Sequence, residues 1–203
     1  MYTPTIGRTG SVVDLAVTIP ALFVLAPFLM LVAIAIKLDS PGPVFFRQER
    51  MGRGNRIFRI LKFRSMRVEA TDANGARSAS RDDDRITRVG KFIRATSIDE
   101  LPQLINVLSG EMSLVGPRPH ALGSTAGNEL FWRVDRQYWH RHALKPGITG
   151  LAQIRGFRGA TNTKRDIVNR LGADLEYQHG WSLLRDVSIL VRTAQVLIHR
   201  NAY

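Results

Sequence analysis

Two adjacent carboxylates, Asp99 and Glu100, are the residues of this sequence best suited to chemistry. They lie in SIDELPQ, where Ser97 followed three residues later by Glu100 predicts a helix start with a capping box. Neighbouring side chains on a helix point about 100° apart, so the two carboxylates would hold different partners, such as a metal ion and a reacting centre. An ionised Asp that meets a diphosphate needs a divalent cation, and Mg²⁺ takes one or two carboxylates together with phosphate oxygens. Ordinary capping of the helix is the alternative, and the pair alone leaves it open.

Basic side chains suited to phosphate occur before and after this pair. The candidates are Lys62, Arg94, Arg118, Arg155 and Arg158. Arg118 lies between two prolines in GPRP, where a charge has no evident packing use, and the last two lie in a glycine-rich turn where backbone N–H groups can approach an anion. Arginine makes bidentate phosphate contacts. Each residue alone is typical of a solvated surface charge, but together they favour a diphosphate ligand.

Composition narrows the classes of partner. The 203 residues correspond to about one domain, and the formal charge of +12 calls for nucleic acid, anionic lipid or a phosphorylated small molecule. The absence of cysteine excludes disulfide scaffolds, thiolate catalysis and cysteine zinc sites. His140 and His142 have no further ligand at metal spacing, and the chain has no Walker motif or nucleophile elbow.

An apolar segment near the N-terminus must place these residues at a membrane. Leu15–Ile36 contains 22 residues without a charge, which as a helix would be roughly 33 Å long. Pro27 predicts a break at Ala26–Pro27, so a bent spanning helix and a re-entrant helix both remain open. Basic residues after the segment put that side in the cytoplasm. A cleaved signal, which lacks a suitable cleavage site here, and a buried core helix are the alternatives.

The remaining elements are short. Val44–Gln48 and Ile57–Phe63 predict a β-hairpin around a turn at 52–55, and the polar stretch 68–84 predicts a mobile loop. Apolar spacing predicts a helix around 86–94 and a second from Ser97 to Leu108. The second helix would turn four apolar side chains inward: Leu101, Leu104, Ile105 and Leu108. The chain closes with an amphipathic helix over 183–199.

Long motifs in this order resemble the bacterial sugar transferase family, the monotopic phosphoglycosyl transferases. The matching stretches are the proline-broken apolar helix, SPGPVFFRQERMGRGNRIFRILKFRSM, the run from Thr87 through SIDELPQLINVLSGEMSLVGPRP, and KPGITGLAQIRGFRG. The likeness covers nearly all of 10–200. It implies an α+β fold: a re-entrant membrane helix in residues 1–38, then a small, mainly helical cytoplasmic catalytic domain in 39–203. A short β-hairpin and amphipathic interfacial helices belong to that domain.

The resemblance also implies roles for individual residues. Asp99 would be the nucleophile and Glu100 its acidic partner, with Mg²⁺ at the pair, while Lys62, Arg94 and Arg118 would surround the phosphates. Ala26–Pro27 matches the break in the family's membrane helix. The GFRG of residues 156–159 is similar to the small, exopolysaccharide-initiating hexose branch, with Arg158 offset by one position.

The implied activity is transfer of a hexose-1-phosphate from a UDP-sugar to polyprenyl phosphate, with release of UMP and a covalent aspartyl intermediate. It would take place on the cytoplasmic face of the bacterial inner membrane. Anionic lipid is a further expected partner, nucleic acid is not expected, and self-association stays open. Two other classes compete: a non-enzymatic membrane scaffold, and a membrane-anchored nucleic-acid-binding protein suggested by the basic charge and by Arg-interleaved aromatics in FFRQER and FRILKFR. The residues do not identify the sugar.

Overall fold

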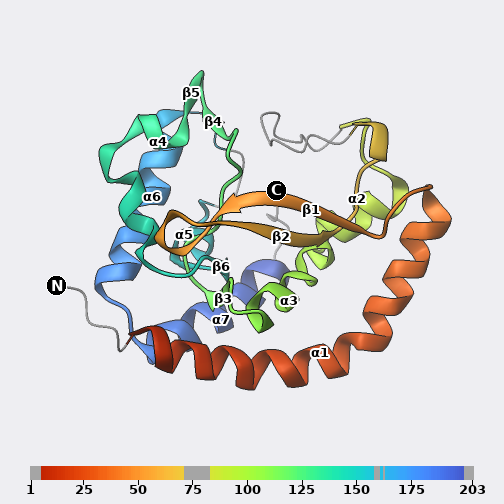
Figure 1. Cartoon of the computed structure of the whole chain (residues 1–203), viewed down its shortest axis with the longest axis horizontal. Helices are drawn as coiled ribbons and strands as arrows, with labels where there is room; N and C mark the ends of the chain where they lie inside the picture. Colours follow the sequence, from red (N-terminus) through yellow and green to blue (C-terminus); the bar gives the residue numbers. More distant parts are fainter. Residues whose placement is uncertain (1–5, 71–82, 158–160, 162, 199–203) are drawn as a thin grey trace.

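The computed structural model describes residues 6–70, 83–157, 161 and 163–198, and it has the predicted mainly helical α+β character. A long helix, α1 (Ile6–Asp39), lies along one edge of the molecule, and shorter helices and small sheets pack above it (Figure 1). The other helices are α2 (Arg88–Ala95), α3 (Gln103–Leu108), α4 (Phe131–Val134), α5 (Leu151–Ile154), α6 (Lys164–His179) and α7 (Leu183–Ile198). The predicted division of the chain at residue 38 stays a prediction.

The predicted hairpin is present as β1 (Phe45–Met51) and β2 (Ile57–Phe63), paired antiparallel from Phe45 opposite Phe63 to Met51 opposite Ile57. Its first strand runs past the predicted end at Gln48. Charged residues interrupt the apolar pattern there, but the ladder continues because Glu49 faces Arg59 across it, with 3.7 Å between their charged atoms. Most of the predicted polar loop lies outside the described residues.

A second, parallel pair of strands was not predicted. It joins β3 (Ser113–Val115) to β6 (Gly147–Thr149), and the short pair β4 (Thr125–Ala126) and β5 (Glu129–Leu130) forms a separate sheet. The ends of β3 and β6 approach backbone to backbone because Gly116 lies against both Gly147 and Gly150. A Cβ on Gly147 would lie 2.1 Å from the Gly116 nitrogen, and one on Gly150 would lie 2.2 Å from the Gly116 oxygen. This contact fixes the loop that carries Arg118.

Both ends of α1 are bonded to the same domain. Near its N-terminus the buried Asp14 carboxylate accepts hydrogen bonds from the Leu114 backbone N–H (2.9 Å) and the Ser113 hydroxyl (3.0 Å). At its C-terminus the Asp39 carboxylate accepts a hydrogen bond from the Val89 backbone N–H at 2.9 Å. The helix therefore cannot swing away from the domain as a separate rod.

The rest of α1 has one face on the domain and one face exposed. The packed face recurs every three or four residues, as one stripe of a helix does; it comprises Asp14, Thr18, Leu22, Leu25, Leu29, Val32 and Ile36. The opposite face includes Phe23, 84% exposed, and Val24, 73% exposed. Gly10–Asp39 is long and apolar enough to cross a membrane, with a mean hydropathy of 2.7 over its most apolar 18 residues. An apolar surface of this size requires a lipid or protein cover.

The segment that carries the carboxylate pair differs from its prediction. Ser97 adopts a left-handed conformation (φ 59°) without a capping hydrogen bond, and a 3-10 turn over Ile98–Glu100 precedes α3, which starts only after Pro102. The predicted capping box is therefore wrong, because the Glu100 side chain bonds to other side chains. Of the four side chains predicted to point inward, Ile105 and Leu108 are each 45% exposed, since α3 is short and shows one face to solvent.

Candidate active site

Glu100 is the centre of a buried ion-pair cluster. Lys62, on β2, donates from Nζ to Glu100 Oε1 at 2.7 Å. Arg118 donates from Nη1 to Oε2 at 3.0 Å and from Nη2 to Oε1, which makes a bidentate pair. Burial alone would raise the pKa of the Glu100 carboxyl, but Arg118 and Lys62 outweigh it and hold that pKa well below its usual range. Glu100 is thus a fixed anion whose two oxygens are already engaged.

Asp99, its neighbour, has different surroundings. The residue is 8% exposed, yet none of the described residues donates a hydrogen bond to its carboxylate. Burial, with the nearby charge of Glu100, raises the pKa of the Asp99 carboxyl above its ordinary value, and the charges of Lys62, Arg94 and Arg118 oppose that rise. An under-solvated carboxylate without a hydrogen-bond partner, close to three cations, is suited to nucleophilic attack or to binding a metal ion.

The structure brings several of the predicted site residues close together. Lys62, Arg94 and Arg118 all act on Asp99, as their predicted places around one phosphate group require. Arg155 instead pairs with Glu176 on the surface, where its guanidinium donates from Nη2 to Glu176 Oε1 at 2.8 Å. Its part in substrate binding stays a prediction, and Arg158 lies outside the described residues.

Sequence reasoning missed a buried network behind the GPRP loop. Arg141 is 1% exposed and donates from Nη2 to the Arg118 carbonyl at 2.7 Å and from Nε to Asp174 at 2.9 Å. His120, two residues after Arg118, lies 3.1 Å from Arg141 and 3.1 Å from Arg170 through its two ring nitrogens. Burial first, and then these arginines, keep the pKa of His120 well below its usual range, so the ring is neutral. The network fixes the backbone on which Arg118 stands.

Arg50 adds a further cation near this loop. It lies on β1 and donates from Nη1 to the Pro119 carbonyl at 3.2 Å. Burial, reinforced by the like charge of Arg118, lowers the pKa of Arg50 to about 10. The sequence offered one signal, an arginine inside a strand, which the predicted strand end at Gln48 excluded.

A magnesium site at Asp99 fits these residues. In the described part of the chain no three acidic or histidine side chains gather as a ready-made metal cage. Mg²⁺ does not need such a cage where substrate phosphates and water complete its shell. The Asp99 oxygens have no hydrogen-bond partner among the described side chains and backbone groups, whereas those of Glu100 are engaged, so Asp99 is the better ligand of the two.

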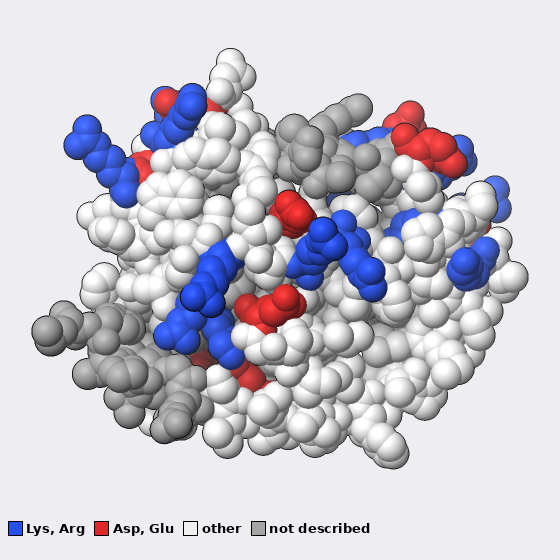
Figure 2. Space-filling model, viewed as in Figure 1, with Lys and Arg blue, Asp and Glu red and all other residues white. Residues whose placement is uncertain are grey.

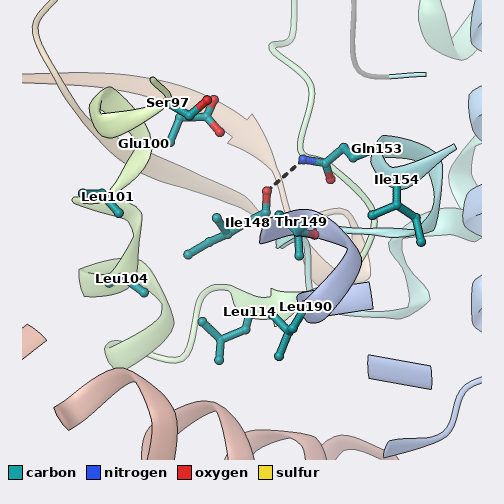
Figure 3. A pocket seen from close by; sticks show the side chains of 11 residues that line it. Ser97, Glu100, Leu101, Leu104, Leu114, Ile148, Thr149, Gln153, Ile154 and Leu190 are labelled. Atoms are coloured by element: carbon teal, nitrogen blue, oxygen red, sulfur yellow. Dashed lines mark hydrogen bonds between the residues drawn. The ribbon is translucent and has the colours of Figure 1, made fainter. Parts of the chain in front are cut away.

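An apolar cavity of about 180 Å³ opens beside Glu100 (Figure 3). Its walls come from the 3-10 turn, α3, β3, β6, α5 and α7. The lining residues are Ser97, Glu100, Leu101, Leu104, Leu114, Ile148, Thr149, Gln153, Ile154, Leu190 and Thr193. The site thus has a charged side at the carboxylate pair and an adjoining apolar side.

The site and its setting define a class of protein. Charged side chains gather near the middle of the face shown in Figure 2, while the lower part of that face, along α1, carries none. A buried carboxylate among cations, next to an exposed apolar helix, is typical of an enzyme that handles phosphate groups at a membrane surface. The chain belongs to the bacterial sugar transferase family, whose model matches residues 8–200.

Individual relatives are similar over most of this chain. It is 51% identical over 191 residues to an undecaprenyl-phosphate glucose phosphotransferase of Komagataeibacter xylinus, covering 94% of this chain but 36% of that protein. It is 48% identical over 180 residues to the exopolysaccharide production protein PSS of Rhizobium leguminosarum bv. phaseoli, covering 89% of this chain and 90% of that protein. A UDP-glucose:undecaprenyl-phosphate glucose-1-phosphate transferase of Caulobacter vibrioides is 51% identical over 189 residues, which are 93% of this chain and 68% of its own.

Proposed function

We propose that this protein transfers glucose-1-phosphate from UDP-glucose to undecaprenyl phosphate and releases UMP, as the first membrane step of exopolysaccharide assembly. The observation that carries the proposal is the buried Asp99 carboxylate, which lies beside Lys62, Arg94 and Arg118 and accepts no hydrogen bond from any residue that the structure describes. Relatives named for this reaction, at 51% identity, supply the donor and the acceptor.

In the first step an Asp99 oxygen attacks the phosphorus that bears the sugar. A new O–P bond forms, the bond from that phosphorus to the bridging oxygen breaks, and UMP leaves with the electron pair. Glu100 holds Lys62 and Arg118 beside the nucleophile, so positive charge is already in place where phosphate oxygens arrive. This arrangement needs little reorganisation during the reaction.

In the second step a phosphate oxygen of the lipid attacks the phosphorus now bound to Asp99. The carboxylate leaves, the polyprenyl diphosphate sugar forms, and Asp99 returns to its starting state. Two displacements replace one direct transfer, which lets the soluble donor and the lipid acceptor use the same site in turn. Mg²⁺ bound at Asp99 would neutralise charge on the donor's diphosphate.

The same proposal includes the re-entrant path of α1 in the cytoplasmic leaflet of the bacterial inner membrane. Its support is that Asp14 and Asp39, near opposite ends of the helix, bond to one domain. A helix that crossed the bilayer would have those ends on opposite sides. Pro27 lies inside α1, where its missing N–H and ring favour a bend at Ala26–Pro27.

The test is UMP release by the purified protein with Mg²⁺. With UDP-glucose alone, we expect a burst of UMP that matches the enzyme concentration, together with a sugar phosphate attached to the protein. Asp99→Asn should give neither, because an amide is a poor nucleophile, and the loss should be several orders of magnitude in rate. UDP-galactose and UDP-N-acetylglucosamine, assayed in parallel, identify the donor.

Two results would count against the proposal. Absence of UMP with every UDP-sugar, in the presence of undecaprenyl phosphate, would refute the activity itself. UMP that appears only once the acceptor is added would replace the covalent route by direct transfer in a ternary complex.

A further inference from the structure

The cavity beside Glu100 is apolar on almost every side except the one formed by Glu100 itself. Leu101 and Leu104 of the α3 region, Leu114 of β3, Ile148 of β6 and Leu190 of α7 form its walls. The polar groups at its edge are few: Gln153 donates from Nε2 to the Ile148 carbonyl at 2.9 Å, and the Thr149 and Thr193 hydroxyls bond to each other at 2.6 Å. Among the described residues only the Gln153 Oε1 of these groups is buried without a partner. A sugar or a nucleotide base would lose hydrogen bonds in such a space, so neither is a suitable occupant.

The cavity also lies between the site and the membrane helix. In Figure 3 Ser97 and Glu100 are at its upper edge, Leu104 and Leu114 lie below them, and α1 passes along the bottom. On the outer side, α7 continues this apolar character with Leu184 at 84% and Val187 at 54% exposed. A ligand in the cavity would therefore have one end at Glu100 and the Lys62 and Arg118 side chains bonded to it, and the other end directed toward lipid.

We propose that this cavity binds the first isoprene unit of the acceptor, next to its phosphate. The inference rests on the proposed function, and it assigns binding of the acceptor's hydrocarbon chain to Leu104 of α3, Leu114 of β3 and Leu190 of α7. Charge complementarity selects the occupant: Lys62 and Arg118, bonded to Glu100 at the cavity's edge, attract a phosphate, and the apolar walls suit a branched hydrocarbon attached directly to it. The volume agrees, because an apolar cavity of about 150 Å³ holds benzene, and the present one measures about 180 Å³.

Binding of this unit orients the acceptor. With the branched carbon chain held among Leu104, Leu114 and Leu190, the attached phosphate is directed toward Asp99 rather than free to rotate at the end of a flexible lipid. Such positioning acts on the second displacement and leaves the first, which uses only the donor, unaffected. This division between half-reactions makes the inference testable separately from the activity.

The experiment compares two substitutions on adjacent residues of α3. Leu104→Trp fills the cavity, whereas Ile105→Trp places the same side chain on the exposed side of the helix. The probe is geranyl phosphate, whose short chain makes contributions from the bulk membrane small. Acceptor KM and the UMP burst from UDP-glucose alone are measured for the wild type and both variants.

We expect Leu104→Trp to raise the KM for geranyl phosphate about tenfold or more, which corresponds to ~1.4 kcal/mol of lost binding, and to retain the donor burst. Ile105→Trp should match the wild type in both. Leu190→Phe, which fills the cavity from α7, should repeat the effect of Leu104→Trp and guards against a local folding defect at α3. A KM unchanged in both cavity-filling variants, with the burst intact, would overturn the inference and leave the proposed activity standing. A wild type without any burst or turnover would instead refute the proposed function.

Discussion

Asp99 and Glu100 are consecutive residues with opposite surroundings: Glu100 accepts hydrogen bonds from Lys62 and Arg118, whereas no described residue donates one to Asp99. The 3-10 turn directs the two side chains to different partners, as adjacent helical positions require. Glu100 consequently organises positive charge, and Asp99 remains available to react. The two residues should respond differently to the same chemical change.

Replacing each carboxylate by the corresponding amide should have different effects on stability at Glu100 and at Asp99. Glu100→Gln leaves Lys62 and Arg118 as buried cations without their anion, and breaking a buried pair typically costs about 3–5 kcal/mol. Asp99→Asn removes a carboxylate whose charged form burial disfavours, so it should leave the melting temperature unchanged or raise it while activity is lost. Thermal melts of both variants at pH 7 check this prediction. Equal destabilisation by both would mean that Asp99 also has a structural role.

Arg118→Lys should lose most activity although the charge is kept. The present side chain makes a two-point contact with Glu100 that a lysine ammonium cannot reproduce, and we expect kcat/KM to fall by about a hundredfold, or roughly 3 kcal/mol. Arg133→Lys, on the exposed side of α4, is the matched control and should resemble the wild type. The measurement is steady-state UMP release at saturating Mg²⁺. If both variants behaved alike, Arg118 would not belong to the site.

The path of α1 can be tested by crosslinking, because the chain has no native cysteine. The Lys145 ammonium lies 3.2 Å from the Ser11 hydroxyl, so cysteines at these two positions should be joined by a short bifunctional reagent in native membranes. A cysteine at Arg88, beside the other end of α1, should not be joined to residue 11. Pro27→Leu restores the helical hydrogen bond and should reduce the Ser11–Lys145 product. Absence of that product in the otherwise unaltered chain would indicate a spanning helix.

His142 should make the protein sensitive to acid. Its Nδ1–H donates to Asn55 Oδ1 at 2.6 Å, and its buried Nε2 has no partner in the part of the chain that the structure describes. Burial lowers the pKa of His142 to about 3. The unfolded chain, with a pKa of about 6.5, binds a proton that the folded chain does not, so stability falls as pH decreases below that value. Between pH 7 and 5 the titration of His142 should lower the free energy of unfolding by about 2 kcal/mol, which corresponds to ~4–8 °C in melting temperature.

The control for this effect is His142→Gln, which cannot titrate. The variant's free energy of unfolding at pH 7 will differ from that of the wild type. Between pH 7 and 5, however, it should fall by about 2 kcal/mol less than the wild-type value does. Identical losses in the two proteins would show that other groups account for the acid sensitivity.

Residue type was enough to select several side chains that lie close together in the folded chain. Lys62, Arg94 and Arg118 were recognisable because phosphate chemistry restricts the choice to a few cations, and the structure places all three near Asp99. The predicted cap at Ser97 was wrong for a reason that lies far along the chain: Lys62 and Arg118 compete for the Glu100 side chain, and local spacing cannot report them.

The missed elements show the same limit. Helix α6 begins with a capping box of Thr163 and Asp166, which is a local signal because the two residues are three positions apart. The ion pair between Arg141 and Asp174 of α6 has no such local signal, because the two residues are 33 positions apart and meet only in the folded chain. Parallel pairing of β3 with β6 likewise depends on glycines from two separate segments. Long-range pairs of this kind have no local periodicity.

The attachment of α1 at both ends has a consequence for the lipid environment. A free transmembrane helix adjusts to a thicker or thinner hydrocarbon layer by changing its tilt. With Asp14 bonded to β3 and Asp39 to α2, this helix cannot tilt unless the whole domain moves with it. The height of Asp99 above the lipid is therefore set by the protein's internal geometry, and it should be the same in bilayers of different thickness.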